Sequence, residues 1–328
     1  MFSKAIAPLK VGIVGTGYAA TKRAEALQAD NRAELITVTG NTPERIQKFC
    51  RTFAISAVDS WQQLINLAEL DLVFICTINR DCGTIARAAL LAGKHVVVEY
   101  PLAISPKLAA EAIDLAASNN KLLHVEHIEI IGGLHRAIVE NLVNIGRVYY
   151  ARYATISPKN PAPRNWNYHK EMYGFPLAAA LSRIHRLTNL FGAVDTVTCQ
   201  NRYWDVGDSD YFTACLCNAR LRFSNNVIAD ITYGKGDVFC YGHRTFEIHG
   251  DRGTLLFEGE KGTLIRGKER SAIDVASRRG LFAKDTTLVL DCLFDGKPLY
   301  ISSQDSLYAL KVAEAARQSA ANDRLIKM

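Results

Sequence analysis

Two glycines near the N-terminus have the spacing of a phosphate-binding turn. The stretch GTGYAA at 15–20 directly follows the apolar run KVGIV and precedes a helical pattern. In this motif the first glycine makes the turn, the second lets backbone amides approach a pyrophosphate, and a small sixth residue permits close helix packing. The alternative is a tight turn that binds nothing. We expect a dinucleotide here, contacted by Gly15, Thr16, Gly17, Tyr18 and Ala19.

The end of the second apolar run, 34–39, bears on which dinucleotide would bind. NAD-binding domains of this type carry an Asp or Glu there, which holds the hydroxyls of the adenosine ribose. This chain has Thr39-Gly40-Asn41-Thr42 instead. No carboxylate would repel a 2′-phosphate, and Asn41, Thr42 and Arg45 could donate hydrogen bonds to one. NADPH is therefore favoured over NADH, although NADH and a solvated Arg45 remain alternatives.

Three further side chains could act on a substrate. Tyr100 follows Glu99 where the valine-rich run 95–99 ends, and a phenol with a pKa of about 10 is a poor general base at neutral pH. Arg183 and Arg186 lie three residues apart, so they face the same way on a helix. Arginine stays protonated, and burying two guanidiniums is costly without anionic partners. A dianionic ligand would satisfy them. The alternatives are pairing with protein carboxylates and, for Tyr100, simple packing.

The elements that must position these residues alternate between strands and helices over the first 127 residues. Such alternation is typical of a parallel, doubly wound Rossmann sheet. In that fold ligands bind at the carboxyl ends of the strands, where the glycine turn, Tyr100 and Glu126 fall. The predicted strands are 10–14, 34–39, 71–77, 95–99 and 121–127.

After residue 145 the pattern changes to period-two strands, interrupted by a helix at about 177–191 and followed by a helix at 303–321. The predicted fold is therefore α/β plus α+β. We expect a Rossmann domain at 1–127 and a largely antiparallel open sheet with helices on one face at 128–302. A C-terminal helix and tail at 303–328 should pack back near the Rossmann domain. The open sheet could be a homo-oligomer surface or the floor of a substrate cleft.

Composition narrows the class of partner. The chain has 328 residues, 48% of them hydrophobic, which is enough for two domains with cores of their own. Its net charge of +6 is dispersed, which argues against nucleic acid as a partner. No apolar run reaches the ~18 residues of a membrane helix, and the eight scattered cysteines lack metal-site spacing. We expect a cytoplasmic protein with no metal and no membrane partner.

Several segments together resemble the glucose-fructose oxidoreductase and inositol dehydrogenase (MocA) superfamily across nearly the whole chain. They are GTGYAA, CTIN at 76–79, AGKHVVVEYP at 92–101, IGRV at 145–148 and EIHGDRGTLLFEG at 247–259. Sugar-oxidising members carry Glu-Lys-Pro and, later, Asp-x-Gly-x-His, whose Lys and His handle the proton of a substrate hydroxyl. This chain has Tyr100 in place of the Lys, and Ala179, Leu181 and Arg183 in place of the Asp, Gly and His. The resemblance therefore implies that alcohol oxidation has been lost.

Within that superfamily the chain resembles the biliverdin reductases, at VVVEYPLAIS (96–105), KLLHVEHIEII (121–131) and GFPLAAALSR with RLTNLFG (174–192). This resemblance implies NADPH-dependent reduction of biliverdin to bilirubin, with hydride added to the central methine carbon while a pyrrole nitrogen gains a proton. It implies Arg183, Tyr100 and Glu126 as catalytic residues and Arg186, with Tyr100 and Arg183, as substrate-binding residues. It adds Thr77, Asn79 and Glu99 to the cofactor contacts.

Two other functions stay open from the sequence. One is a sugar or cyclitol dehydrogenase of the same superfamily, against which the missing Lys and His count. The other is a non-catalytic NADP-binding sensor, in which the cofactor site survives without hydride transfer. Of the neighbours Glu126 and His127, which period-two geometry points to opposite faces, we favour Glu126 as the substrate contact. The aromatic segment 160–174 is either a mobile loop over a flat ligand or a packed surface loop.

Overall fold

The computed structural model describes residues 5, 7–205 and 210–328. The chain divides into two compact units. Unit 1 comprises Met1–Ile128 with Arg279–Leu307, and unit 2 comprises Glu129–Arg278 with Tyr308–Met328. The boundaries expected from the sequence differ, since they assign residues 279–302 to the second domain and the whole of 303–328 to a segment near the first.

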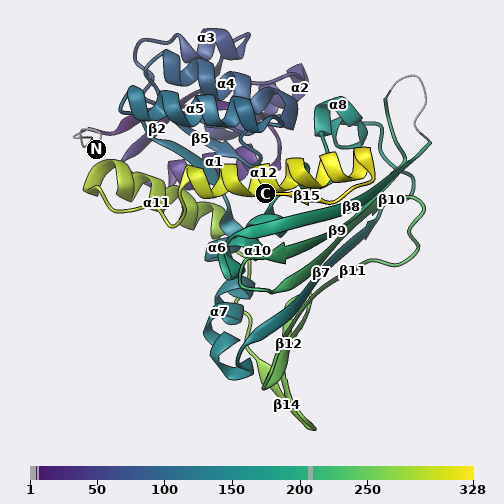
Figure 1. Cartoon of the computed structure of the whole chain (residues 1–328). Coiled ribbons are helices and arrows are strands. Elements are labelled where there is room, and N and C mark those ends of the chain that lie inside the picture. Colours follow the sequence, from purple (N-terminus) through teal and green to yellow (C-terminus); the bar gives the residue numbers. More distant parts are fainter. Residues whose placement is uncertain (1–4, 6, 206–209) are drawn as a thin grey trace. The chain divides into compact units, whose positions relative to one another are not determined.

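Unit 1 is built on a six-stranded sheet with the order β3-β2-β1-β4-β5-β6, and every neighbouring pair is parallel (Figure 1). The chain proceeds from β1 outward to β3 and then returns to β4, so the order reverses between β1 and β4. This topology confirms the predicted doubly wound sheet. The strands are β1 (Leu9–Val14), β2 (Ala33–Thr39), β3 (Ser56–Ala57), β4 (Leu72–Ile75), β5 (His95–Glu99) and β6 (Leu123–Glu126). The helices are α1 (Tyr18–Gln28), α2 (Pro43–Phe53), α3 (Trp61–Ile65), α4 (Asn79–Leu91), α5 (Pro106–Ser118) and α11 (Leu281–Asp295).

The strands of unit 1 are apolar along their length because helices cover both faces of a parallel sheet. All four residues of β4, LVFI, are buried. On α1 the buried residues Ala20, Ala24 and Leu27 recur at helical spacing and face this core. Helix α11 adds Val289 and Leu290 to the same core, although unit 2 separates it from the rest in the sequence. The returning chain therefore completes unit 1.

Unit 2 is built on a nine-stranded sheet with the order β14-β13-β12-β11-β7-β10-β9-β8-β15. Only the central β7 and β10 run parallel; the other described pairs are antiparallel. The strands are β7 (Val148–Pro158), β8 (Val194–Trp204), β9 (Ala214–Phe223), β10 (Ile228–Gly236), β11 (His243–Gly250), β12 (Gly253–Glu258), β13 (Lys261–Arg266), β14 (Glu269–Ile273) and β15 (Ile326–Lys327). The helices are α6 (Ile128–Ile131, at the unit boundary), α7 (Gly133–Ile145), η1 (Trp166–Tyr168), α8 (Lys170–Tyr173), α9 (Pro176–Ala179), α10 (Ser182–Phe191) and most of α12 (Ser303–Asn322).

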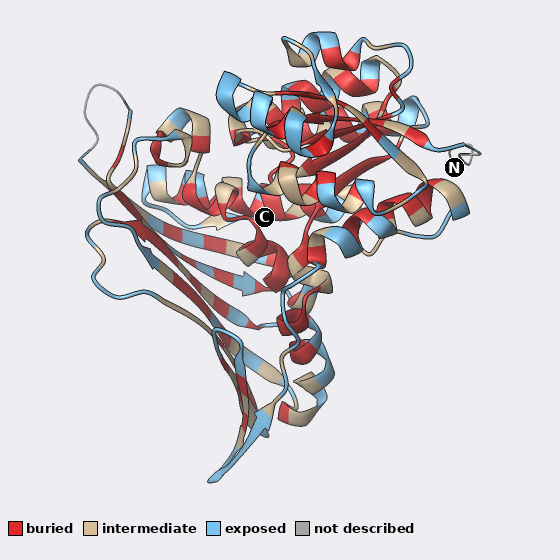
Figure 2. Ribbon diagram, turned by 180° about the vertical axis from the view of Figure 1, so that it is seen from behind, coloured by how far each residue is buried: buried red, intermediate tan, exposed pale blue. Residues whose placement is uncertain are grey.

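The sheet of unit 2 has one buried and one more exposed face, as the alternating colours along its strands show (Figure 2). On β9, alternate residues from Cys215 to Phe223 are buried, while Asn218, Arg220 and Arg222 are exposed. The prediction of a largely antiparallel open sheet is confirmed. The helix predicted at 177–191 is instead two helices, α9 and α10, separated by residues 180–181.

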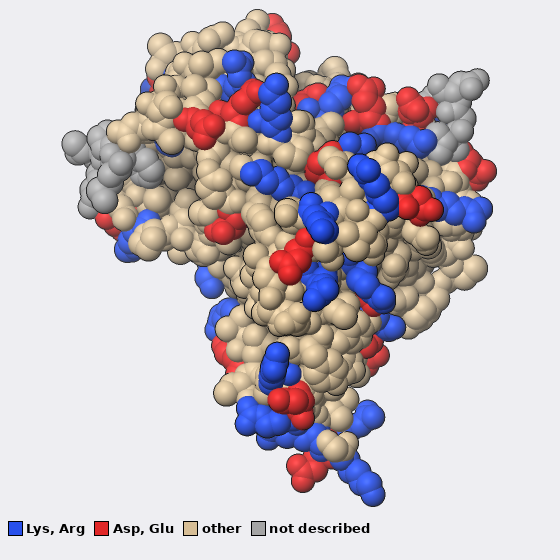
Figure 3. All heavy atoms as spheres, viewed as in Figure 1, with Lys and Arg blue, Asp and Glu red and all other residues tan. Residues whose placement is uncertain are grey.

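Two surface properties bear on the class of partner. Over residues 5, 7–205 and 210–328, no helix combines the length and apolar character needed to cross a bilayer. On the face of the molecule seen in Figure 3, Lys and Arg side chains are interspersed with Asp and Glu. The described residues on that face therefore form no extended basic stripe of the kind that tracks a nucleic acid backbone.

Candidate active site

The glycine turn lies between β1 and α1 of unit 1. Gly15 has φ +118°, and a Cβ there would stand 2.1 Å from the backbone oxygen of Cys76, so the protein itself requires glycine at this position. Gly17 is different, because a Cβ added there would meet no atom of the described residues within 4 Å, its two chain neighbours aside. Gly17 caps the N-terminus of α1 without a side-chain hydrogen bond. A glycine that protein packing does not demand, at a helix N-terminus, fits close approach by a phosphate.

The predicted 2′-phosphate contacts lie at the end of β2 and the start of α2. Asn41 and Arg45 are exposed, and Thr42 caps the N-terminus of α2 without a side-chain hydrogen bond. Among the residues that the structure describes, no carboxylate pairs with Arg45. This end of β2 therefore presents donors and a cation, which fits a phosphorylated ribose.

Thr77 and Asn79 follow β4, which is the neighbour of β1 in the sheet. The backbone amide of Cys76 donates to the carbonyl of Val14 at 2.8 Å, so the chain after β4 stays beside the chain after β1. Asn79 begins α4 and is buried. The two residues therefore share an edge of the sheet with Gly15, as their predicted role requires.

Glu99 ends β5, and its side chain is ion-paired inside unit 1. The Oε1 atom of Glu99 accepts from Nε of Arg23 at 2.9 Å, and Arg23, on α1, is fully buried. Burial by itself lowers the pKa of Arg23, but the charges of Glu99 and Asp285 outweigh it and raise the pKa well above the ordinary value. A carboxylate held in this way stabilises the end of β5.

Tyr100, Glu126 and His127 lie at the carboxyl ends of the paired strands β5 and β6. Glu99 and Glu126 are partners in the register of the sheet. The ring of Tyr100 stacks on the imidazole of His127, with ring centroids 5.2 Å apart and planes 4° from parallel. Glu126 is 2% exposed, and its Oε1 accepts from the backbone amide of Ile128 at 2.6 Å. The structure thus brings together the three side chains that the sequence placed at this edge.

Arg183 and Arg186 lie on α10 and face the buried side of the unit 2 sheet. The Cζ atom of Arg183 is 5.1 Å from the ring centroid of Tyr233 on β10, and Cζ of Arg186 is 5.9 Å from that of Tyr153 on β7. The (i, i+3) spacing therefore puts both guanidiniums over aromatic rings of neighbouring strands.

The surroundings of Arg186 leave much of its charge uncompensated. Arg186 is 1% exposed, and its Nε and Nη1 atoms have no hydrogen-bond partner among the described residues. Burial lowers the pKa of Arg186. The phenol of Tyr153 and the charge of Glu129 raise this pKa, and the charges of Arg244 and Arg183 lower it further. A buried guanidinium with so little support fits a site that receives an anion.

Two residues beside Arg186 escaped the sequence reasoning. Nη2 of Arg244, on β11, donates to the hydroxyl of Tyr153 at 2.8 Å, and Tyr153 is 1% exposed. Burial alone would raise the pKa of Tyr153, yet Arg186, Arg244 and Arg183 lower it below its ordinary value. One signal was available in the sequence: Arg244 occupies the same alternation as the buried Phe246 and Ile248, so it had to point inward.

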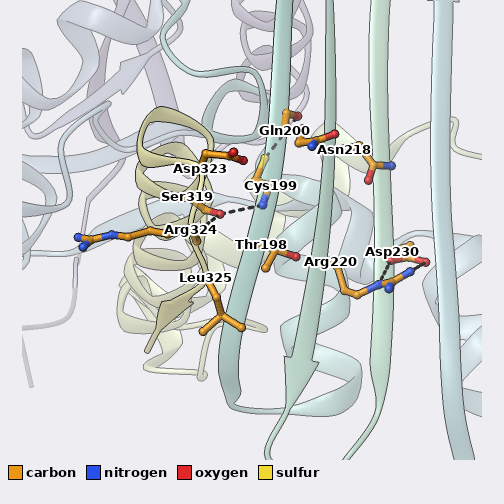
Figure 4. Close-up of a pocket in the computed structure, with 10 residues that line it drawn as sticks. All are labelled: Thr198, Cys199, Gln200, Asn218, Arg220, Asp230, Ser319, Asp323, Arg324 and Leu325. Carbon is orange, nitrogen blue, oxygen red and sulfur yellow. Dashed lines mark hydrogen bonds and ion pairs between the residues drawn. The ribbon is translucent and has the colours of Figure 1, made fainter.

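The aromatic segment at 160–174 is partly packed. Tyr168 and Tyr173 are buried, and Nζ of Lys235 on β10 donates to the backbone oxygen of Asn167 at 2.5 Å. A different feature, a cavity of about 370 Å³, lies on the more exposed side of the sheet beside the C-terminal segment (Figure 4). None of its ten lining residues is a predicted site residue. No group of three or more His, Cys, Asp or Glu among the described residues could hold a metal ion.

Comparison with known proteins identifies the family to which the chain belongs. Residues 9–127 match the model of an oxidoreductase family with an NAD-binding Rossmann fold, and residues 140–328 match that family's C-terminal alpha/beta domain. The chain therefore belongs to this family of oxidoreductases, the GFO/IDH/MocA family, which confirms the superfamily resemblance drawn from the sequence.

Individual relatives narrow the resemblance further. A crystal structure of biliverdin reductase in complex with biliverdin and NADP+ from Synechocystis sp. PCC 6803 is 54% identical in sequence, with a TM-score of 0.94, and the match covers 96% of this chain and 99% of that one. Biliverdin reductase A of mouse is 28% identical over 202 residues, and the human protein is 28% identical over 149 residues. These matches take in 60% and 44% of this chain, and the chain spans only 63% of the mouse and 47% of the human protein.

Proposed function

We propose that this protein reduces biliverdin to bilirubin with NADPH. The observation that carries the proposal is the 54% identity, over 96% of the chain, to the Synechocystis protein whose structure holds biliverdin and NADP+. The residues agree with that chemistry, because Tyr100 and Arg183 stand where an alcohol dehydrogenase of the family would need a base. When bound, NADPH supplies the hydride for the central methine carbon.

On the cofactor side, we assign the backbone of residues 15–19 to the pyrophosphate and Asn41, Thr42 and Arg45 to the 2′-phosphate. Gly17 supports the first assignment, since neither its φ of −84° nor packing against protein atoms calls for glycine. The exposed guanidinium of Arg45 supports the second. Thr77, Asn79 and Glu99 complete the set, with Glu99 acting through its ion pair with Arg23.

On the substrate side, we assign Arg183 to the reacting part of the bilin, where its charge would stabilise negative charge as hydride arrives or relay a proton through water. Arg186, supported by Arg244 and Tyr153, would bind a propionate. Among the described residues, Nε and Nη1 of Arg186 have no hydrogen-bond partner, which supports this role because a carboxylate ligand offers bidentate hydrogen bonds to a guanidinium. Tyr100 would contact the flat face of the bilin, and Glu126 would tune or supply a proton.

The test is a spectrum. Purified protein, NADPH and biliverdin are mixed, and the long-wavelength band of biliverdin is followed as bilirubin absorption replaces it near the blue. In a parallel experiment the protein is mixed with NADP+ and each of a panel of sugars and cyclitols, and the formation of NADPH is followed. Conversion of biliverdin supports the proposal. Oxidation of a cyclitol, or NADPH binding with no turnover of either kind across acidic and neutral pH, would refute it.

Variants then test the role of Arg183. Because a group that stabilises charge only in the transition state contributes about 10²- to 10³-fold to kcat, Arg183→Met should lower kcat by that order while the Kd for NADPH stays within about twofold. Arg220→Met is the matched control, since Arg220 lies on the exposed face of the same sheet in an ion pair with Asp230. Equal losses of turnover and NADPH affinity in Arg183→Met would contradict the assignment.

A further inference from the structure

Helix α11 brings a carboxylate into the interior of unit 1. Asp285 is fully buried, and its Oδ2 accepts from Nη1 of Arg23 at 2.5 Å. Its Oδ1 lies 2.8 Å from Nε2 of His124 and accepts from the hydroxyl of Tyr300, also at 2.8 Å. Burial by itself raises the pKa of Asp285, but the charges and hydrogen bonds of these partners hold it well below the ordinary range. Asp285 is therefore an ionised group that three segments of unit 1 share.

One chain of contacts leads from Asp285 to the backbone beside Tyr100. The Arg23 guanidinium that pairs with Asp285 also donates, through Nε, to Oε1 of Glu99 at 2.9 Å. Glu99 is the residue directly before Tyr100. Because Arg23 is fully buried between two carboxylates, the end of β5 has little freedom to move.

A second chain of contacts leads from Asp285 to the ring of Tyr100. The hydroxyl of Tyr300, which donates to Asp285, accepts from the backbone amide of His127 at 3.0 Å. The imidazole of His127 stacks on Tyr100, and its Nε2 lies 2.9 Å from Oγ of Ser306. Burial lowers the pKa of His127 to about 3, so the stacked imidazole is neutral at physiological pH. Two connections to Tyr100, one along the chain through Glu99 and one across its ring through His127, therefore lead back to Asp285.

We propose that Asp285 and Tyr300 are positioning residues that fix the ring of Tyr100 for the flat tetrapyrrole. This inference rests on the proposed function and adds residues far along the chain to it. Replacing Asp285 would also remove one of the two carboxylates that pair with the buried Arg23 and could unfold the unit. Tyr300→Phe is the sharper change, because it breaks the contact between Asp285 and the His127 amide while the ion pair with Arg23 stays intact. Ser306→Ala is a second variant, which releases the other side of His127.

The measurement is the affinity for biliverdin with NADP+ present, so that no turnover is needed, together with kcat/KM with NADPH. Tyr300→Phe should raise the Kd for biliverdin about fivefold, which at about 1.4 kcal/mol per tenfold is about 1 kcal/mol. In a Tyr100→Ala background the same change should have less than about a twofold effect, because its effect passes through Tyr100. Ser306→Ala should show the same loss and the same dependence on Tyr100. The Kd for NADPH should stay within about twofold.

Tyr308→Phe is the matched control, since the hydroxyl of Tyr308 also accepts a hydrogen bond from a backbone amide. The donor is Val194 of unit 2, at 2.7 Å. This variant should leave both quantities unchanged. If Tyr300→Phe and Ser306→Ala weaken binding equally with and without Tyr100, the contacts are merely structural and the inference is overturned. The proposed function fails separately, when the wild-type protein binds biliverdin with the expected dependence on Tyr300 but does not reduce it. A wild-type protein that binds no biliverdin overturns both.

Discussion

Replacing Lys235 with methionine should weaken the pH dependence of the protein's free energy of unfolding in the alkaline range. Lys235 lies on β10 and is 7% exposed. Its Nζ is 3.5 Å from the ring centroid of Tyr173, 4.6 Å from that of Tyr168 and 5.5 Å from that of Phe212. Burial lowers the pKa of Lys235 from 10.5 to about 8, and the thiol of Cys215 acts weakly against it.

The sign and size of the pH dependence that Lys235 gives to the free energy of unfolding follow from proton linkage. Between about pH 8 and 10.5 the folded protein has released the Lys235 proton while the unfolded chain still binds it, so the free energy of unfolding rises with pH in that window. From about pH 7 to 10 the rise is at most about 2.5 kcal/mol, at about 1.36 kcal/mol per pKa unit. The aromatic rings reduce it, because they favour the charged form.

The assay is urea unfolding at several values between about pH 7 and 10, for the wild-type protein and Lys235→Met, with the free energies of unfolding compared at each pH. The difference between the two proteins should shift in favour of the wild type as pH rises. Lys261→Met, in an exposed position of the same sheet, should follow the wild-type pH dependence. A difference between wild type and Lys235→Met that stays constant over this range would refute the reasoning.

Three further outcomes are expected. Arg45→Ala should raise the KM for NADPH about tenfold, because at least one charge-assisted hydrogen bond is lost. The KM for NADH, measured by initial rates, should stay within about twofold. Equal changes for both cofactors would contradict a 2′-phosphate contact. Gly15→Ala, whose Cβ would stand 2.1 Å from the oxygen of Cys76 at φ +118°, should weaken NADPH binding more than tenfold in a fluorescence titration; unchanged affinity would show that the turn can relax. Burial lowers the pKa of His127 to about 3 and of His135 to about 4, so below about pH 6.5 only the unfolded chain binds these protons, and stability should fall by up to about 1.4 kcal/mol per pH unit for each histidine. His135→Gln should therefore flatten the acid limb of the unfolding free energy, and an unchanged limb would exclude His135 as a cause.

The fold could be predicted where local pattern decides the structure. In unit 1 each strand is a short apolar run bounded by a turn and a helix, so alternation alone gave the doubly wound sheet. Helix α11 could not be placed in the same way. Its buried residues Val289, Leu290 and Leu293 pack into the core of unit 1, but nothing in their spacing shows which of two cores they join. Only the packed structure answers that, because helix α1, against which α11 packs, lies more than 200 residues away in the chain.

The same distinction separates the site residues that could be predicted from those that could not. Tyr100 and Glu126 could be placed at one edge of the sheet because the carboxyl ends of neighbouring parallel strands must share an edge. Asp285 and Tyr300 contact that edge from a distant segment, and a single Asp or Tyr in a helical or loop pattern is most often an ordinary surface residue. Arg244 is an intermediate case. The period-two alternation of its strand gives the face of the sheet to which it points, but not the residue that it contacts.

The two units use buried arginines in opposite ways, and the contrast identifies where a ligand charge belongs. In unit 1 the buried Arg23 has two carboxylates, Glu99 and Asp285, so its charge is compensated within the protein and the contacts can serve to fix geometry. In unit 2 Arg186 is equally buried, yet within the part of the chain that the structure describes no carboxylate forms an ion pair with it, and the charge of Glu129 is offset by those of Arg244 and Arg183. A buried unpaired charge costs several kcal/mol, and a fold that retains it gains when an anion binds. Biliverdin with free propionates should therefore stabilise unit 2 against unfolding, whereas its dimethyl ester, which has the same ring system without the charges, should stabilise it far less. Equal stabilisation by the acid and the ester, followed as the shift of the unfolding midpoint at matched ligand concentration, would show that the arginines do not bind the carboxylates.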